Sequence, residues 1–165
     1  MPIRILFVGA GEMSRTCAQS LLSRGAKSII VSNRSYDKAV ELAAEMKGSA
    51  MKFDEWEHAL HEVDVIISST SAPHFVITTE LTRAGIARRP DRPLLLIDIA
   101  VPRNVDPEVS RLPNVHCCDI DDLQTRLNGG VADRQREVPR VEAIVAEEAA
   151  TFTNWLTKLE IAPVI

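Results

Sequence analysis

Short apolar runs alternate with amphipathic stretches along most of this chain. Five apolar runs predict buried strands, and a shorter run at 49–53 resembles an edge strand. The five runs span residues 3–8, 28–32, 63–68, 94–99 and 115–118. Continuous apolar strands that alternate with helices are typical of parallel sheets covered on both faces. We therefore expect an α/β fold with a doubly wound, mainly parallel, six-stranded sheet.

Capping residues and glycines predict where the helices begin and end. A helix over 12–24 should end at Gly25, and a helix after Ser35 should end at Gly48. The second helix is expected to bury Ala39, Val40, Ala43 and Met46. Asp54, Thr78 and Asp106 are candidate caps of helices over 55–61, from 78 to about 86, and from Pro107. The turn "RRPDRP" at 88–93 should lie at the surface, with its arginines solvated.

The pattern changes after Asp121, because residues 131–159 carry no strand signal. Apolar residues recur there every three or four positions, which predicts one long amphipathic helix, kinked or begun at Pro139. We therefore expect a sheet domain over 1–127 and a connecting helix over 128–165. Phe152 and Trp155 would need a partner, and the apolar ends of the chain suggest a piece of a longer protein.

Composition narrows the possible classes of protein. The chain has 165 residues, of which 45% are hydrophobic, and its net charge of −4 argues against a nucleic-acid-binding surface over its whole length. No apolar run approaches the roughly 20 residues that span a bilayer. Three cysteines, an odd number, make no disulfide framework and no zinc pattern. We expect a cytoplasmic protein without a metal site and without a catalytic group of its own.

A glycine motif follows the first predicted strand and opens the first predicted helix. Gly9 suits the tight turn and Gly11 the close approach of a pyrophosphate, whereas Ser14 replaces the third glycine of the Rossmann fingerprint. The pyrophosphate would lie at the helix N-terminus. The candidate residues are Gly9, Ala10, Gly11, Glu12, Met13 and Ser14.

The end of the second predicted strand distinguishes between cofactors. An NAD site usually has Asp or Glu there, which accepts hydrogen bonds from the ribose hydroxyl. This chain has Asn33, Arg34 and Ser35 instead, and an arginine can hold a 2′-phosphate through charge-assisted bonds. The sequence therefore favours NADP(H).

Two further strand ends should face the same ligand, because ligands of open α/β sheets bind beyond the carboxyl ends of the strands. The small, hydroxyl-rich loop after the fourth strand supplies Ser69, Thr70 and Ser71. The loop after the fifth strand supplies the candidates Ile99, Ala100 and Pro102 for the nicotinamide. Asp98 fits a loop-ordering role and a functional role equally well. A lone loop histidine such as His74 is more often solvated than catalytic.

Several of these motifs occur together in one known family. "VGAGEMS", "VSNRSYDKAVELA", "DVIISSTSAPH", "LLLIDIAVPRNVDPEV" and "NVHCCDIDDL", followed by the closing "WLTKLEIAPVI", resemble the NADPH-binding domain of glutamyl-tRNA reductase. The resemblance implies a domain of an enzyme that reduces glutamyl-tRNA to glutamate-1-semialdehyde in tetrapyrrole (porphyrin) biosynthesis. It also implies that the catalytic cysteine and most of the tRNA contacts belong to another domain, and that the enzyme is a homodimer.

Three alternatives remain open at this point. One is an NADP domain similar to shikimate dehydrogenase, although "IDIAVPR" with "DIDDL" would be unusual for it. The second is a nucleotide-sensing module without catalysis, and the third is a scaffold that has lost its cofactor.

Overall fold

The structure is a computed structural model, and it describes residues 2–127. The chain divides into one compact unit up to Asp121 and a second unit from Asp122 onwards. Only residues 122–127 of the second unit are described, and they are helical. The predicted connecting helix over 128–165, with Pro139, Phe152 and Trp155, lies outside the described residues.

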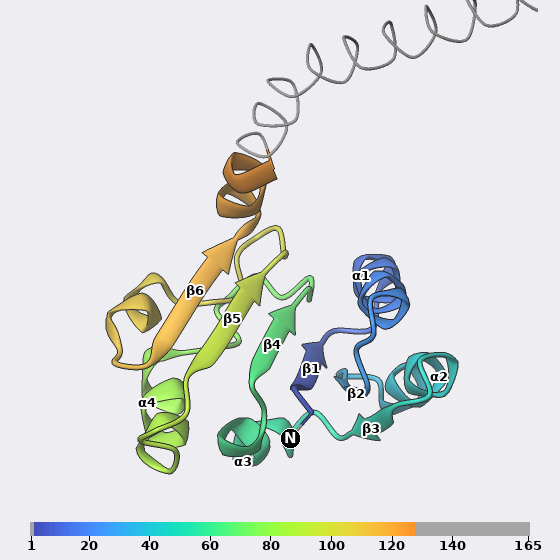
Figure 1. Ribbon diagram of the computed structural model, residues 1–165, viewed down its shortest axis with the longest axis horizontal. Helices are drawn as coiled ribbons and strands as arrows, with labels where there is room; N and C mark the ends of the chain where they lie inside the picture. Colours follow the sequence, from blue (N-terminus) through green and yellow to red (C-terminus); the bar gives the residue numbers. More distant parts are fainter. Residues whose placement is uncertain (1, 128–165) are drawn as a thin grey trace, which may run out of the picture. The chain divides into compact units, whose positions relative to one another are not determined.

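All six strands of the sheet run parallel, in the order β3-β2-β1-β4-β5-β6 (Figure 1). The strands are β1 Arg4–Val8, β2 Ser28–Ser32, β3 Ser49–Met51, β4 Val65–Ser68, β5 Leu94–Asp98 and β6 Val115–Asp119. The expected doubly wound parallel fold is confirmed. The order reverses between β1 and β4, and in such sheets this switch point opens a crevice at the carboxyl ends of the strands.

Helices cover both faces of the sheet (Figure 1). The α-helices are α1 Glu12–Ser23, α2 Tyr36–Glu45, α3 Trp56–Ala59 and α4 Thr79–Ala87, and the 3-10 helices are η1 Leu60–Glu62 and η2 Pro107–Arg111. Alternate residues of β1 serve the two cores: Leu6 and Val8 pack with α3, α4 and η2, whereas Ile5 and Phe7 pack with α1 and α2.

Helix α2 differs from its prediction in one buried residue and in its end. Val40 is 43% exposed, and the fully buried Leu42 takes its place beside Ala39 and Ala43. The helix ends at Glu45, and Lys47 rather than Gly48 adopts a left-handed conformation after it (φ 51°). Gly48 serves a different purpose, because a Cβ on it would lie 2.3 Å from the Ile29 carbonyl oxygen.

Two of the three further caps are confirmed. The Thr78 hydroxyl accepts from the Leu81 N–H at 3.3 Å, and the Asp106 carboxylate accepts from the Glu108 N–H at 3.0 Å. The element after Asp106 is a 3-10 helix rather than an α-helix. Asp54 caps nothing: α3 begins at the buried Trp56, with Glu55 in the capping position. The segment before α3 is a turn, in which the Glu55 N–H bonds to the Lys52 carbonyl at 3.1 Å.

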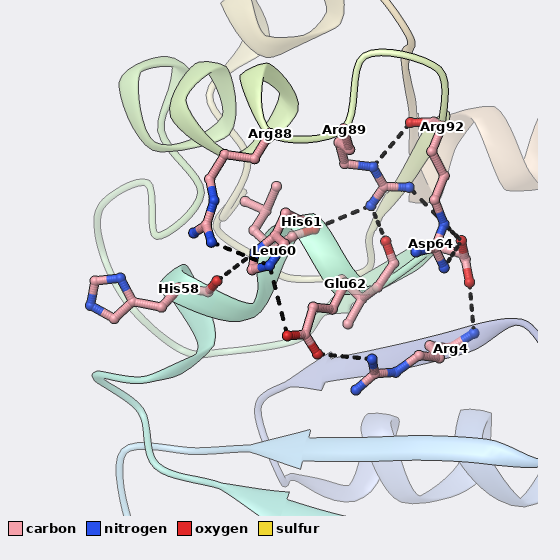
Figure 2. Close-up of polar contacts among 10 residues, drawn as sticks. Arg4, His58, Leu60, His61, Glu62, Asp64, Arg88, Arg89 and Arg92 are labelled. Carbon is pink, nitrogen blue, oxygen red and sulfur yellow. Dashed lines mark hydrogen bonds and ion pairs between the residues drawn. The ribbon is translucent and has the colours of Figure 1, made fainter.

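The prediction that the arginines of the 88–93 turn are solvated is wrong for Arg89, which is only 4% exposed. Its guanidinium donates to the carbonyls of Leu60 (3.2 Å), Pro93 (2.6 Å), Arg92 (3.0 Å) and Val63, and Figure 2 shows the bonds to Leu60 and Arg92. These carbonyls lie just before β4 and β5, so Arg89 closes the amino edge of the sheet at these two strands. Two of the four acceptors, Leu60 and Val63, come from a distant segment, which local sequence pattern does not reveal.

Candidate functional site

A cleft of about 370 Å³ lies at the carboxyl edge of the sheet, where β1 and β4 diverge. Its volume falls within the range of roughly 300–1,000 Å³ that is common for small-molecule sites. The cleft is lined by Gly9, Ala10, Gly11, Asn33, Arg34, Lys38, Phe53, Ser69, Thr70, Ser71, Ala72 and Pro73. The structure thus brings together predicted residues from the ends of β1, β2 and β4.

The two glycines of the loop after β1 are needed for different reasons. Gly9 has φ 117°, and a Cβ on it would lie 2.9 Å from the Ser69 carbonyl oxygen. Gly9 is therefore required by the fold itself. Gly11 has no atom near its missing Cβ within 4 Å, so the space above its backbone is open to the cleft that it lines. This open cradle matches what the backbone approach of a pyrophosphate requires.

The start of α1 offers further backbone donors to the same space. Its first backbone bond joins the Arg15 N–H to the Gly11 carbonyl at 3.1 Å, so the preceding N–H groups have no acceptor within the helix. Such N–H groups and the helix dipole favour an anion. The exposed side chains of Glu12 and Met13 do not line the cleft, which leaves backbone N–H groups as their possible contribution.

Ser14 lies beneath the glycine loop rather than in the cleft, and it is fully buried. Its hydroxyl donates to the Gly9 carbonyl at 2.8 Å and also bonds to the Ser69 hydroxyl. The serine that replaces the third glycine therefore ties α1 to the glycine loop and to the loop after β4. It is small enough to permit close packing of helix and strand, and its polar group is satisfied.

Two cations face the part of the cleft beyond β2. Arg34 was predicted there, whereas Lys38 on the first turn of α2 and Phe53 after β3 were missed. The position of Lys38 on the first turn of the helix predicted after Ser35 was the available signal. Asn33 accepts from the Ala10 N–H at 3.3 Å and donates to the Ser35 carbonyl at 3.1 Å, so it ties the glycine loop to the end of β2. Ser35 itself does not line the cleft.

The loop after β4 forms the opposite wall of the cleft with the predicted Ser69, Thr70 and Ser71. Ala72 and Pro73 continue the wall and were not predicted. His74 is exposed, as expected of a solvated loop histidine, and it does not line the cleft.

The loop after β5 does not line the cleft, although Ile99, Ala100 and Pro102 were predicted as contacts. Ala100 is buried, and Pro102 is exposed and follows a cis peptide bond. Asp98, left undecided by the sequence, has a loop-ordering role. Its carboxylate accepts from the N–H groups of Asn104 (2.7 Å), Val105 (2.8 Å) and Ala100 (3.1 Å) and from the Ser68 hydroxyl (3.0 Å).

Cys17 and Cys117 show no sign of activation. Burial raises the pKa of the Cys17 thiol. Partial desolvation raises the pKa of the Cys117 thiol, and the Asp98 carboxylate raises it further. Since the thiolate is the nucleophile, neither environment favours reaction. Within residues 2–127 no three metal-ligating side chains come together, and no helix in that range is long and apolar enough to cross a membrane.

The strand order, the switch-point cleft and the glycine loop together define a Rossmann-type dinucleotide-binding domain. The chain belongs to the family described as shikimate / quinate 5-dehydrogenase, whose model matches residues 2–126. Family and cleft together indicate a nicotinamide dinucleotide as the cofactor.

The relatives point to one enzyme in particular. The chain is 43% identical over 162 residues to the glutamyl-tRNA reductase of Solidesulfovibrio magneticus, covering 98% of this chain and 36% of the relative. It is also similar to the solved structure of glutamyl-tRNA reductase from Methanopyrus kandleri, with 42% identity and a TM-score of 0.85 over 96% of this chain and 40% of that one.

The nucleotide-binding domain of the Thermoplasma volcanium glutamyl-tRNA reductase shares the fold, with a TM-score of 0.62 at 21% identity over 81% of this chain and 86% of that one. The predicted resemblance to glutamyl-tRNA reductase is thereby confirmed. The chain spans little more than a third of the length of the curated relatives that it matches.

Proposed function

We propose that the cleft binds NADP(H), with its adenosine half beyond β2 and its pyrophosphate over Gly11. The observation that carries this proposal is a pair of cations that line the cleft: Arg34, just beyond the end of β2 where an NAD site would have a carboxylate, and Lys38 on the first turn of α2. A 2′-phosphate carries up to two negative charges, and two nearby cations can bind it through charge-assisted hydrogen bonds. The backbone of the glycine loop would hold the pyrophosphate, and the loop after β4 would lie along the ribose.

We further propose that the chain is the NADPH-binding domain of a glutamyl-tRNA reductase, which reduces glutamyl-tRNA to glutamate-1-semialdehyde in tetrapyrrole biosynthesis. Similarity over 98% of the chain supports this assignment over a shikimate dehydrogenase activity, even though the family model carries the latter name. NADPH would supply the hydride. The residues of this chain would bind and orient it, while the cysteine that holds the glutamyl group would belong to another domain.

A chimeric enzyme tests this assignment. The matching segment of the Solidesulfovibrio magneticus reductase is replaced by this chain, and NADPH oxidation is followed with glutamyl-tRNA as substrate. We expect glutamyl-tRNA-dependent oxidation, and we expect the Arg34→Ala chimera to need a higher NADPH concentration. A folded chimera that ignores glutamyl-tRNA contradicts the assignment, and one that oxidises shikimate instead supports the alternative.

The homodimer and the cytoplasmic location remain predictions. The expected dimer contacts involve residues 128–165, which lie outside the described residues. Sedimentation of the 165-residue chain at micromolar concentration checks the association: we expect a dimer, and a monomer contradicts it.

A further inference from the structure

Asn104 lies behind the loop after β4, in the segment that follows β5, and it is fully buried. Its side-chain Oδ1 accepts from the Thr70 N–H at 2.8 Å and from the Thr70 hydroxyl at 2.9 Å. Thr70 lines the cleft, whereas Asn104 does not. The side chain of Asn104 therefore reaches the cleft only through Thr70.

The same residue also holds the far end of that loop. The Asn104 carbonyl oxygen accepts from the N–H groups of Val76 (2.8 Å) and Ile77 (2.9 Å), and Ile77 forms a parallel bridge with Val105. One residue thus binds the loop near its start, at Thr70, and again at its end. Of the residues that line the cleft, Ser71, Ala72 and Pro73 lie between the two attachments. Ser69 lies just before the first attachment, Thr70.

The backbone of Asn104 is itself held by the carboxylate of Asp98. The Asn104 N–H donates to the Asp98 carboxylate at 2.7 Å, and the Val105 N–H donates to the same oxygen at 2.8 Å. Asp98 ends β5, so the chain of contacts begins in the sheet, passes through Asn104 and ends at Thr70 in the cleft. A side chain locked by such a second layer of hydrogen bonds can set the geometry of a binding wall.

The chemistry of the amide fixes its orientation. The Thr70 backbone N–H can only donate, so the side-chain atom facing it must be the oxygen of Asn104. The Asn104 Nδ2 then points elsewhere, and it has no hydrogen-bond partner within the described part of the chain. The acceptor of this buried side chain serves Thr70 alone among the contacts described.

We propose that Asn104 is a positioning residue for the dinucleotide cleft, acting through Thr70 to hold the loop after β4 in its ligand-binding geometry. This inference rests on the proposed cofactor function and adds a role to a residue outside the cleft. It predicts that Asn104 and Thr70 act as one unit in cofactor binding.

A double-mutant cycle on the 165-residue chain tests this coupling, with NADPH affinity measured by calorimetric titration. Asn104→Leu removes the acceptor at similar volume and should weaken NADPH binding roughly three- to tenfold, the equivalent of one neutral hydrogen bond. Thr70→Val removes only the hydroxyl half of this link and should weaken NADPH binding by the same factor or less. The double variant should bind no worse than Asn104→Leu alone, because the bond to Asn104 that Thr70→Val removes is already broken in Asn104→Leu.

Two further variants separate positioning from a general weakening of the loops. Thr70→Ser, which keeps the hydroxyl, should recover most of the affinity lost in Thr70→Val. Thr79→Val removes a threonine hydroxyl that bonds to Asp106 at 2.8 Å, outside the cleft, and should leave NADPH affinity unchanged. If Thr79→Val weakens binding as much as Thr70→Val, or if the two losses in the cycle simply add, the inference is overturned.

Amide hydrogen exchange provides a readout that needs no cofactor. In the ligand-free chain, Asn104→Leu should accelerate exchange at the Thr70 amide, because its acceptor is gone. Unchanged exchange there overturns the inference, as does faster exchange with unchanged NADPH affinity. If Asn104→Leu does not fold, the Thr70→Val and Thr70→Ser pair decides alone. A wild-type chain that binds neither NADPH nor NADH overturns the proposed function together with this inference, whereas normal wild-type binding with an uncoupled cycle overturns the inference only.

Discussion

The two edges of the sheet are both held by a buried charged side chain, but by charges of opposite sign. At the amino edge the Arg89 guanidinium donates to four backbone carbonyls, of which Figure 2 shows those of Leu60 and Arg92. At the carboxyl edge the Asp98 carboxylate accepts from three backbone N–H groups and one hydroxyl. Each charge satisfies backbone groups that would otherwise be unpaired.

The two edges differ in whether the space beside the buried charge is filled or is left free for a ligand. Arg89 inserts its own side chain among the segments before β4 and β5, with Asp64 and Arg92 around it, so the amino edge is filled at these two strands (Figure 2). Asp98 organises its loop from inside the fold, and the neighbouring ends of β1 and β4 leave the cleft free. The comparison predicts that changes at the amino edge affect stability alone, and that changes in the cleft affect binding.

The largest expected effect comes from Arg89→Met, which keeps much of the side-chain length but removes every donor. Four carbonyls lose a partner in a buried place, so we expect a loss of about 3–5 kcal/mol in the free energy of unfolding. Urea denaturation measures the loss, and NADPH affinity of the folded fraction should not change. Arg88→Met is the matched control, since Arg88 is exposed and makes one long contact, 3.4 Å to His61. Equal losses in both variants would contradict the role of Arg89.

The next effect comes from Arg34→Ala in the cleft. A hydrogen bond to a charged group contributes about 1.5–3 kcal/mol, so NADPH binding should weaken on the order of ten- to a hundredfold. NADH binding should change little, and the melting temperature should stay the same because Arg34 is exposed. Lys38→Ala should show a smaller effect in the same direction. Equal losses for the two cofactors would indicate stacking on adenine instead of 2′-phosphate binding.

A smaller effect is expected where the glycine loop and the loop after β4 meet. Ser14→Gly restores the usual third glycine but removes the bonds to Gly9 and Ser69 and places a glycine in α1. We expect the free energy of unfolding to fall by about 1–2 kcal/mol, with the melting temperature as readout. A Ser14→Gly chain that is more stable than the wild type would contradict the stabilising role of the Ser14 hydrogen bonds. Ser14→Ala separates the lost hydrogen bonds from the added flexibility.

The smallest expected effect is a change in the reactivity of the Cys117 thiol, which serves as a probe of the charge at the carboxyl edge. Desolvation and the Asp98 carboxylate both raise the pKa of its thiol. Asp98→Asn removes the charge and should lower that pKa, so alkylation of Cys117 at a fixed pH near 8 should become faster. Mass spectrometry of the Cys117 peptide measures the alkylation rate, and circular dichroism checks that the variant is folded. The Arg89→Met chain should show no such change, and an equal acceleration there would mean that general loosening is the cause.

The strands of this fold could be predicted from the sequence because buried parallel strands are apolar along their whole length. The glycine loop and the residues after β2 and β4 were predictable for a related reason: ligand contacts follow strand ends, and the strand ends were visible. Arg89 and Asn104 could not be found in this way, since Arg89 bonds to Leu60 and Val63, and Asn104 bonds to Thr70, across distant parts of the chain. Lys38 and Phe53 were missed because they reach the cleft from the start of α2 and from beyond β3 rather than from the end of a predicted buried strand. The residues predicted after β5, which are Ile99, Ala100 and Pro102, do not line the cleft, because the Asp98 carboxylate binds the backbone of that loop.

Titration of the 165-residue chain with NADPH and with NADH tests the central claim most directly, because the claim assigns the carboxyl-edge cleft to a cofactor with a 2′-phosphate. We predict that NADPH binds at least tenfold more tightly than NADH, and that the preference disappears when Arg34 and Lys38 are both replaced by Ala. Equal or tighter binding of NADH, or no binding of either cofactor, would contradict the account.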